Sequence, residues 1–229
     1  MRARVVAHLL PRGFAHLASA PRRGVVFATL MTAIAGFLDA VGYIQLQHLY
    51  VSFMSGNSTH FGMSLARADW SDVALAGVII SAFVAGALAG TLVAEASDGL
   101  VVIAVLGCEL ALLLLAVAIA HGGHDHPALV LVALAMGMQN ALHQMVAGAD
   151  VGKGFITGAL FALGQSLAQW LHRRAPLAQA ASNLLSWLAF IGGAVLGTLT
   201  LDGIGLVDAL AVICLAYALM IAAIGADLL

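Results

Sequence analysis

The sequence has very few charged residues for its length. Lysine, arginine, aspartate and glutamate together make up 9% of its 229 residues, and hydrophobic residues make up 62%, whereas a soluble domain carries roughly 25% charged residues. This composition excludes an ordinary water-soluble domain. We expect an all-α polytopic membrane protein whose partner is the lipid bilayer. At about 20 apolar residues per crossing, the chain has room for roughly six to eight membrane segments.

Cysteines and basic residues are also scarce. The two cysteines, Cys108 and Cys214, both lie in apolar runs, so we expect neither a disulfide nor a thiolate metal site. With nine basic residues and a formal charge of -2, we expect no nucleic-acid partner. No nucleophile elbow, phosphate loop or zinc-protease helix occurs in the sequence. We therefore predict that the protein is not an enzyme and that it has no cofactor and no metal site. An intramembrane enzyme, which needs only a few polar groups, is the alternative left open.

Residues 1–24 contain five arginines and no acidic residue. Ala18 to Ala20 resemble a signal-peptide cleavage box, but Pro21 follows directly and argues against cleavage. We interpret this segment as a retained basic lead. The positive-inside tendency then predicts a cytoplasmic N-terminus.

Six long apolar segments predict membrane helices. They span 25–46, 73–94, 100–120, 127–147, 180–200 and 204–228. Two shorter segments, 51–66 and 155–171, are apolar enough to enter the membrane but marginal for a full crossing.

The two halves of the chain share motifs in the same order. Residues 83–92 (FVAGALAGTL) and 190–199 (FIGGAVLGTL) are identical at six of ten positions. GFLDA at 36–40 similarly matches GMQNA at 137–141, and SGNSTHFGMSLA at 55–66 matches TGALFALGQSLA at 157–168. These matches predict an internal duplication, with each half holding three long helices and one short or interrupted helix. The predicted divisions are a basic lead (1–24), a first membrane repeat (25–120), a His-rich linker (121–126) and a second membrane repeat (127–229).

The topology of the two repeats is open between two arrangements. If the short segments cross the membrane, each half has four passes, the halves are parallel and Arg67 lies inside. If the short segments are re-entrant or broken, each half has three passes, the halves are inverted and Arg67 lies outside. The distribution of basic residues fits both arrangements equally well. Short, glycine-interrupted segments at matching positions are typical of transporter binding sites, which favours the inverted arrangement.

Several of these motifs are also familiar as a set. GFLDAVGY, FMSGNS, GMQNA and FITGAL, in this order, resemble the YoaK-like family of small multi-pass bacterial membrane proteins, and the resemblance covers nearly the whole chain from Met31 onward. The family usually has Thr-Gly-Asn where this chain has Ser55-Gly56-Asn57. The resemblance implies six membrane helices and a location in the bacterial inner membrane. It implies no substrate, because the family's function is uncharacterised.

Asp39 lies near the middle of the first apolar segment. An isolated acid there costs about 2.5–3.5 kcal/mol on insertion scales, so it needs a partner, a cavity or a proton. The matching residue in the second half is Asn140, a neutral isostere. A duplicated site with one titratable member suits a carrier coupled to protons or another cation. Alternatively, Asp39 braces a contact between helices.

Polar residues in the two short segments and in one long helix are candidates for solute or ion binding. Gly56 could be a point where the backbone unwinds and exposes carbonyl and N–H groups. The alternative is close packing of helices through small residues. The complete set of binding candidates is Asp39, Ser55, Gly56, Asn57, Ser58, Thr59, His60, Asn140, His143, Gln144, Thr157 and Gly158.

Glu109 is a second acid within an apolar segment and, with Asp39, a candidate for coupling. It could pair with His143 or Lys153 or carry protons. The alternative is that it plays no coupling role.

Glycine pairs four residues apart occur in matching helices, at Gly86 and Gly90 and at Gly193 and Gly197. This spacing predicts close helix packing. The HGGHDHP segment at 121–127 lacks recognised metal-ligand spacing, so we interpret it as a solvated linker.

Together these features predict an inner-membrane transporter or permease for an unidentified small solute, with proton or cation coupling as an open question. The alternative is a non-transporting membrane scaffold or sensor whose polar groups serve helix association. The sequence also leaves open whether the chain forms a homo-oligomer.

Overall fold

The computed structural model describes residues 21–97, 99–146, 156–226 and 228. Most of the basic lead therefore lies outside the described residues. Within them every regular secondary-structure element is a helix, which confirms the all-α prediction. Its helices are α2 (Pro21–Gln45), α3 (Met54–Ala66), α4 (Trp70–Ala96), α5 (Val101–His121), α6 (Asp125–Val146), α7 (Ile156–Leu171) and α8 (Leu177–Gly225).

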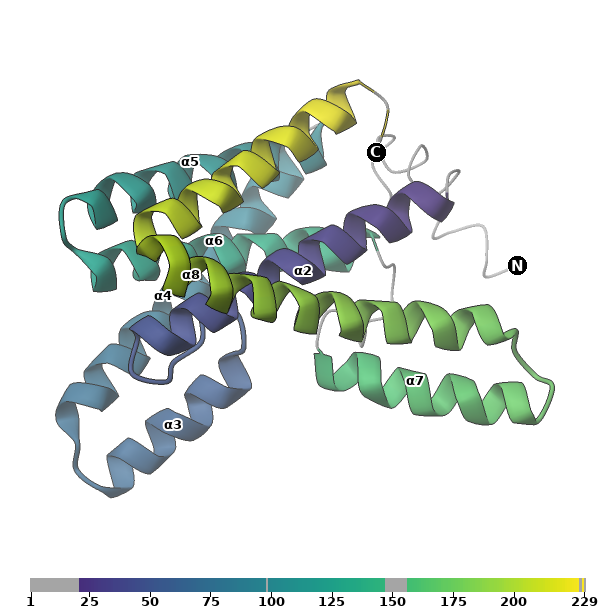
Figure 1. Ribbon diagram of the computed structural model, residues 1–229, viewed down its shortest axis with the longest axis horizontal. Helices are drawn as coiled ribbons and strands as arrows, with labels where there is room; N and C mark the ends of the chain where they lie inside the picture. Colours follow the sequence, from purple (N-terminus) through teal and green to yellow (C-terminus); the bar gives the residue numbers. More distant parts are fainter. Residues whose placement is uncertain (1–20, 98, 147–155, 227, 229) are drawn as a thin grey trace.

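The two short segments form the shortest of these helices. α3 has 13 residues and α7 has 16, which correspond to lengths of about 20 Å and 24 Å at 1.5 Å per residue. Both lengths fall below the hydrocarbon thickness of about 30 Å. Each short helix instead packs along the helix that follows it, α3 against α4 and α7 against α8 (Figure 1).

Four helices are long and apolar enough to cross a membrane, namely α2 from Arg23 onward, α4, α5 and α8. The six long segments expected from the sequence occupy five helices, of which these four are long and apolar enough to cross. Segments 180–200 and 204–228 join in the single 49-residue helix α8. α6 is long enough but more polar, because it carries Asp125, Gln139 and Asn140.

α8 is broken at Gly205. This residue has φ 81° and ψ 176° inside an otherwise helical run, a conformation that only glycine adopts readily. Figure 1 shows the chain changing direction sharply at this point, so that α8 has a first arm (177–204) and a second arm (206–225). The two predicted helices are therefore recognisable as the two arms, joined without a loop.

α2 and α8 cross at very short range. Glycines on both helices face the partner's backbone, so that a Cβ atom at any of them would overlap it. The touching pairs are Gly36 with Phe190, Gly193 with Ala33, and Gly197 with Phe37. Only small residues allow helix backbones to approach this closely, and such contacts hold helices together where no water drives their association.

α4 and α6 cross in the same way. The touching pairs are Gly137 with Phe83, Gly86 with Leu134, and Gly90 with Met138. Each residue of this crossing lies 101 or 107 positions from its counterpart in the α2–α8 crossing. Both crossings therefore use positions that the predicted duplication would make equivalent. With the short helices α3 and α7 counted as second in each half, the first helix of one half (α2 or α6) meets the third helix of the other half (α8 or α4).

The remaining contacts close the bundle. α5 packs between α6 and α8 and lies beside the second arm of α8 in Figure 1. α6 has a largely buried inner face along its described residues. Its buried hydrophobic residues include Ala128, Leu129, Val132, Ala133, Ala135, Met136 and Leu142.

We predict that Gly193→Ala lowers the thermal stability of the purified protein in detergent. The added methyl group would overlap the Ala33 carbonyl and force α2 and α8 apart, at a cost of about 1–3 kcal/mol for overpacking. Gly192→Ala is the matched control, because a Cβ there meets no atom within 4 Å. It should leave the melting temperature unchanged or slightly raised, since alanine favours helix over glycine. Equal melting temperatures for the two variants would contradict a close crossing at Gly193.

Candidate functional site

The loop between α2 and α3, residues 46–53, folds over Asp39. One carboxylate oxygen, Oδ1, accepts hydrogen bonds from the backbone N–H groups of Val51 at 3.0 Å and Ser52 at 2.6 Å. The other, Oδ2, accepts a hydrogen bond from the Ser52 hydroxyl at 2.7 Å. Asp39 is only 2% exposed. Its carboxylate thus satisfies two backbone N–H groups and one hydroxyl group of the loop.

Asn57 holds the same loop from the α3 side. Its Oδ1 accepts a hydrogen bond from the Tyr50 backbone N–H at 2.8 Å, and its Nδ2 donates to the Tyr50 carbonyl at 2.7 Å. Nδ2 also lies 3.6 Å from the Met54 sulfur. Because Asn57 is fully buried, a single side-chain amide satisfies both backbone polar groups of Tyr50. We call Asp39 and Asn57 the loop clamp.

The clamped loop has a strained backbone and a buried apolar side. Gln47 and His48 have φ values of 52° and 72°, in the left-handed region that non-glycine residues rarely adopt. Leu46, Leu49 and Val51 point into the core of the bundle.

The ring of Tyr50 lies between those of Tyr43 and Phe53, with centroid distances of 5.0 Å and 5.2 Å. Burial, together with Tyr43 and Asp39 nearby, raises the pKa of the Tyr50 hydroxyl above its ordinary value of 10.0. The phenol therefore stays neutral at physiological pH.

The other candidates on α3 do not converge on one pocket. The exposed Ser58 and Thr59 donate their hydroxyl protons to the carbonyls four residues earlier in the helix, at 2.8 Å and 3.0 Å. Ser55 is also exposed. Gly56 lies within α3, where the chain is helical, so the expected unwinding does not occur at this glycine. The non-helical stretch lies just before it, where the loop clamp supplies the missing backbone hydrogen bonds.

His60 faces α4. Its Nε2 lies 3.2 Å from Oδ2 of Asp72, and both side chains are about one-quarter exposed, at 23% and 26%. Asp69 caps the start of α4, and hydrogen bonds from the Ser71 hydroxyl and the Asp72 N–H hold the pKa of Asp69 below its ordinary value of 3.8. His60 therefore takes part in a polar contact that fixes the α3–α4 turn.

The candidates of the second half are spread along α6 and α7. The Nδ2 of Asn140 donates to the Met136 carbonyl in its own helix at 2.9 Å. Thr157 is exposed and Gly158 is half-buried, both on α7. The side chains of His143 and Gln144 lie outside the described residues, as does Lys153.

Glu109 lies at the centre of the bundle, fully buried. Within the described part of the chain, neither of its carboxylate oxygens has a hydrogen-bond partner of ordinary geometry. The side chain that acts on it electrostatically is Tyr217 of the second arm of α8, which is itself fully buried. From α6, Gln139 Nε2 lies 3.5 Å from the Tyr217 hydroxyl and 3.7 Å from the Met31 sulfur of α2. We call Glu109, Tyr217 and Gln139 the central cluster.

Tyr217 and Gln139 were absent from the sequence-based set of site residues. Tyr217 is one of only three tyrosines and interrupts an otherwise apolar segment, which was the available signal for it. Gln139 neighbours the candidate Asn140. Their association with Glu109 depends on how α5, α6 and α8 pack, which no local pattern reveals.

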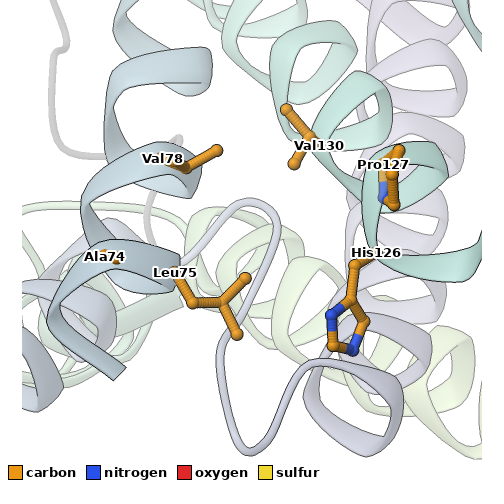
Figure 2. Close-up of a pocket in the computed structure, with 6 residues that line it drawn as sticks. All are labelled: Ala74, Leu75, Val78, His126, Pro127 and Val130. Carbon is orange, nitrogen blue, oxygen red and sulfur yellow. The ribbon is translucent and has the colours of Figure 1, made fainter. Parts of the chain in front are cut away.

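Surface hollows of the described residues include one between α4 and α6 and one at the α7–α8 turn, and neither is lined by a candidate residue. Figure 2 shows the first, between α4 and α6, with a volume of about 490 Å³. Its lining is apolar except for His126. The second lies at the α7–α8 turn. It is lined by Trp170, Arg173, Arg174, Ala175 and Pro176.

The His-rich linker is exposed between α5 and α6. Among the residues that the structure places, no three histidine, cysteine, aspartate or glutamate side chains are arranged to hold a metal ion.

Comparisons with known proteins place this architecture among membrane proteins. A family model described as "Protein of unknown function (DUF1275)" matches residues 27–224. A UPF0700 transmembrane protein of Rhizobium meliloti (strain 1021) is 30% identical over 178 residues, which cover 76% of this chain and 74% of the relative. No solved structure matches the chain. The comparisons confirm the predicted likeness to an uncharacterised membrane family, and neither carries the YoaK-like name.

We predict that Asn57→Ala destabilises the protein more than Ser58→Ala does. Alanine at 57 would leave the partly buried N–H and C=O of Tyr50 without their partner, which costs about 1–3 kcal/mol. Ser58 is exposed and bonds only to its own helix, so its loss should change the free energy of unfolding by less than about 0.5 kcal/mol. Thermal unfolding of the two purified variants measures the difference. If both melted at the wild-type temperature, the loop would not depend on Asn57.

Proposed function

This chain belongs to the DUF1275 family of membrane proteins, and we propose that it is a permease carrying a small solute across the bacterial inner membrane. In this proposal the N-terminus is cytoplasmic, the protein performs no enzymatic reaction and its transport is linked to a proton or cation. The observation that carries the proposal is the pair of glycine crossings built from equivalent positions of the two sequence halves.

The pairing of helices at these crossings is reciprocal. The first half supplies α2 to the α8 crossing and α4 to the α6 crossing, while the second half supplies α8 and α6. Two repeats related by a pseudo-two-fold axis are expected to exchange helices in this way. The matched sequence segments 83–92 and 190–199 contain the glycines on one side of each crossing. We therefore infer an internal duplication.

The directions of equivalent helices support an inverted arrangement of the repeats. In Figure 1, α2 runs from right to left, whereas α6, its counterpart, runs from left to right. Opposite directions of equivalent helices are the mark of an inverted-topology repeat, a construction found in many secondary transporters. In this arrangement α3 and α7 do not cross the bilayer, consistent with their lengths.

The crossings also suit a rocking motion between two bundles. At their closest points, glycines meet backbone atoms of the partner helix, so a small change of crossing angle there requires little repacking of large side chains. Alternating access by such motion, around a site near the repeat interface, is the usual mode of inverted-repeat carriers.

A second candidate function is a non-transporting membrane scaffold or sensor. The specific observation in its favour is the loop clamp, because the polar atoms of Asp39 and Asn57 are occupied by the loop. In that case the polar groups would serve only to fix the fold. The transport experiment below separates the two functions.

The inverted arrangement predicts opposite sides of the membrane for Arg67 and Arg173. In a background with Cys108→Ala and Cys214→Ala, we expect Arg67→Cys to react with a membrane-impermeant maleimide added to intact spheroplasts. Arg173→Cys should react only after permeabilisation, which makes it the matched control. Protection of both cysteines from the outside reagent would instead indicate parallel halves.

Transport itself is testable in proteoliposomes containing the purified protein. We expect stopped-flow light scattering to reveal faster entry of at least one solute from a panel of amino acids, monocarboxylates, polyols and polyamines than in protein-free liposomes. Gly193→Ala should slow this entry and Gly192→Ala should not, because only the former changes the α2–α8 crossing. Solute entry equal to that of empty liposomes across the panel would favour the scaffold function.

A further inference from the structure

The central cluster is unusual because it combines an acid with deep burial and no compensating charge. Glu109 has no exposed surface, and neither carboxylate oxygen meets a hydrogen-bond donor at ordinary distance among the described side chains. An ionised carboxylate buried without a partner is strongly destabilising, whereas a protonated carboxyl group carries no charge to desolvate. The surroundings of Glu109 in this conformation therefore suit the protonated acid.

Tyr217 and Gln139 are arranged so that Glu109 can exist either as the protonated acid or as the carboxylate. Gln139 Nε2 donates a hydrogen bond to the Tyr217 hydroxyl oxygen at 3.5 Å. The hydroxyl proton of Tyr217 is then left to point toward Glu109, the group with which Tyr217 interacts. A modest approach of the two helices would complete a Tyr217-to-Glu109 hydrogen bond, which stabilises a carboxylate.

The chemistry of the cluster fits a proton better than a metal cation. Hard cations such as Mg²⁺ and Ca²⁺ take six or more oxygen ligands. Here the groups around Tyr217 include the Gln139 amide nitrogen and the Cys214 thiol, and the Met31 sulfur lies next to that amide nitrogen. In the described structure, Tyr217 is the one titratable side chain that acts on Glu109, and Cys214 acts in turn on Tyr217.

The position of the cluster links it to both halves of the protein. Glu109 belongs to α5, the last helix of the first half, and Tyr217 belongs to the second arm of α8, the last helix of the second half. Gln139 belongs to α6 and contacts Met31 of α2, the first helices of the two halves. Any rocking of one half against the other changes the separation of these groups.

We propose that Glu109 is a proton-binding site, with Tyr217 and Gln139 as positioning residues, that couples movement of the two halves to a proton gradient. This inference rests on the proposed transport function and names its coupling ion. We call the arrangement of the two halves in this structure the closed arrangement. In it, one proton resides on the Glu109 carboxyl group. When motion of the halves admits water, that proton leaves to the water and the remaining carboxylate accepts the Tyr217 hydroxyl proton in a hydrogen bond. Rebinding of a proton from the other side restores the closed arrangement.

Asp39, the other intramembrane acid, is a poorer site for this role. Its two oxygens already accept three hydrogen bonds from Val51 and Ser52. Proton uptake there would disturb the loop clamp. The contrast makes Asp39 a matched control for Glu109.

The proton site is tested directly by infrared spectroscopy of the full-length protein in lipid nanodiscs, titrated from acidic to alkaline pH. We expect a protonated-carboxyl C=O band that persists at neutral pH and is lost in Glu109→Gln. Asp39→Asn should keep this band. Tyr217→Phe should keep the band but shift its frequency and its titration midpoint, because the nearest hydroxyl group is gone. A purely structural role for Tyr217 would move neither.

Two results would overturn the proton site. The first is a wild-type spectrum in which the protonated-carboxyl region is unchanged by Glu109→Gln. The second, which needs no Glu109 variant to fold, is a Tyr217→Phe protein whose carboxyl band and midpoint equal those of the wild type. The outcome is separate from transport. A titrating Glu109 band without solute entry would contradict the permease but not the proton site, and solute entry without such a band would contradict only the proton site.

Discussion

The close approach of helix backbones at two glycine crossings is the constraint on which the rest of this structure depends. In the bilayer no hydrophobic force drives apolar helices together, so association depends on close packing and on polar contacts. Glycines at positions 36, 193 and 197 and at 137, 86 and 90 bring α2 onto α8 and α4 onto α6 at backbone contact. These contacts set the helix positions that create the buried centre, and a side chain at any one of them would change that centre.

The polar groups inside this frame divide into two kinds. The loop clamp is saturated, because Asp39 and Asn57 each bond to backbone groups of the loop that they hold. The central cluster is not saturated, since neither carboxylate oxygen of Glu109 has a hydrogen-bond partner of ordinary geometry among the described residues. Tyr217 acts on Glu109 electrostatically, and Gln139 lies beside Tyr217. A saturated group rigidifies a fold, whereas an unsatisfied buried acid stores free energy that a conformational change can release. In this bundle, the hydrogen-bond saturation of a buried polar side chain distinguishes a structural role from a functional role better than the presence of an acid does.

The same distinction bears on the short helices. α3 and α7 stay helical and lie against α4 and α8. The non-helical backbone next to α3 is the loop 46–53 that precedes it. The backbone groups that a broken helix would offer to a solute are here bonded to Asp39 and Asn57. A solute path in the proposed permease is therefore better sought along the interface of the two halves, near the central cluster, than at the start of α3.

The sequence alone determined the class of the protein, because its scarcity of charge and its apolar runs leave no alternative to a helical membrane protein. It also located the glycine pairs at 86 and 90 and at 193 and 197, since their spacing is a local pattern. It identified Asp39, Asn57 and Glu109 as polar residues in an apolar setting but did not distinguish their roles. The role of Asp39 depends on Val51, which lies 12 residues further along the chain. The role of Glu109 depends on Tyr217, which belongs to another helix. Only the tertiary structure decided which polar group is satisfied and which is left without a partner, because hydrogen-bond saturation depends on three-dimensional neighbours and not on residue type.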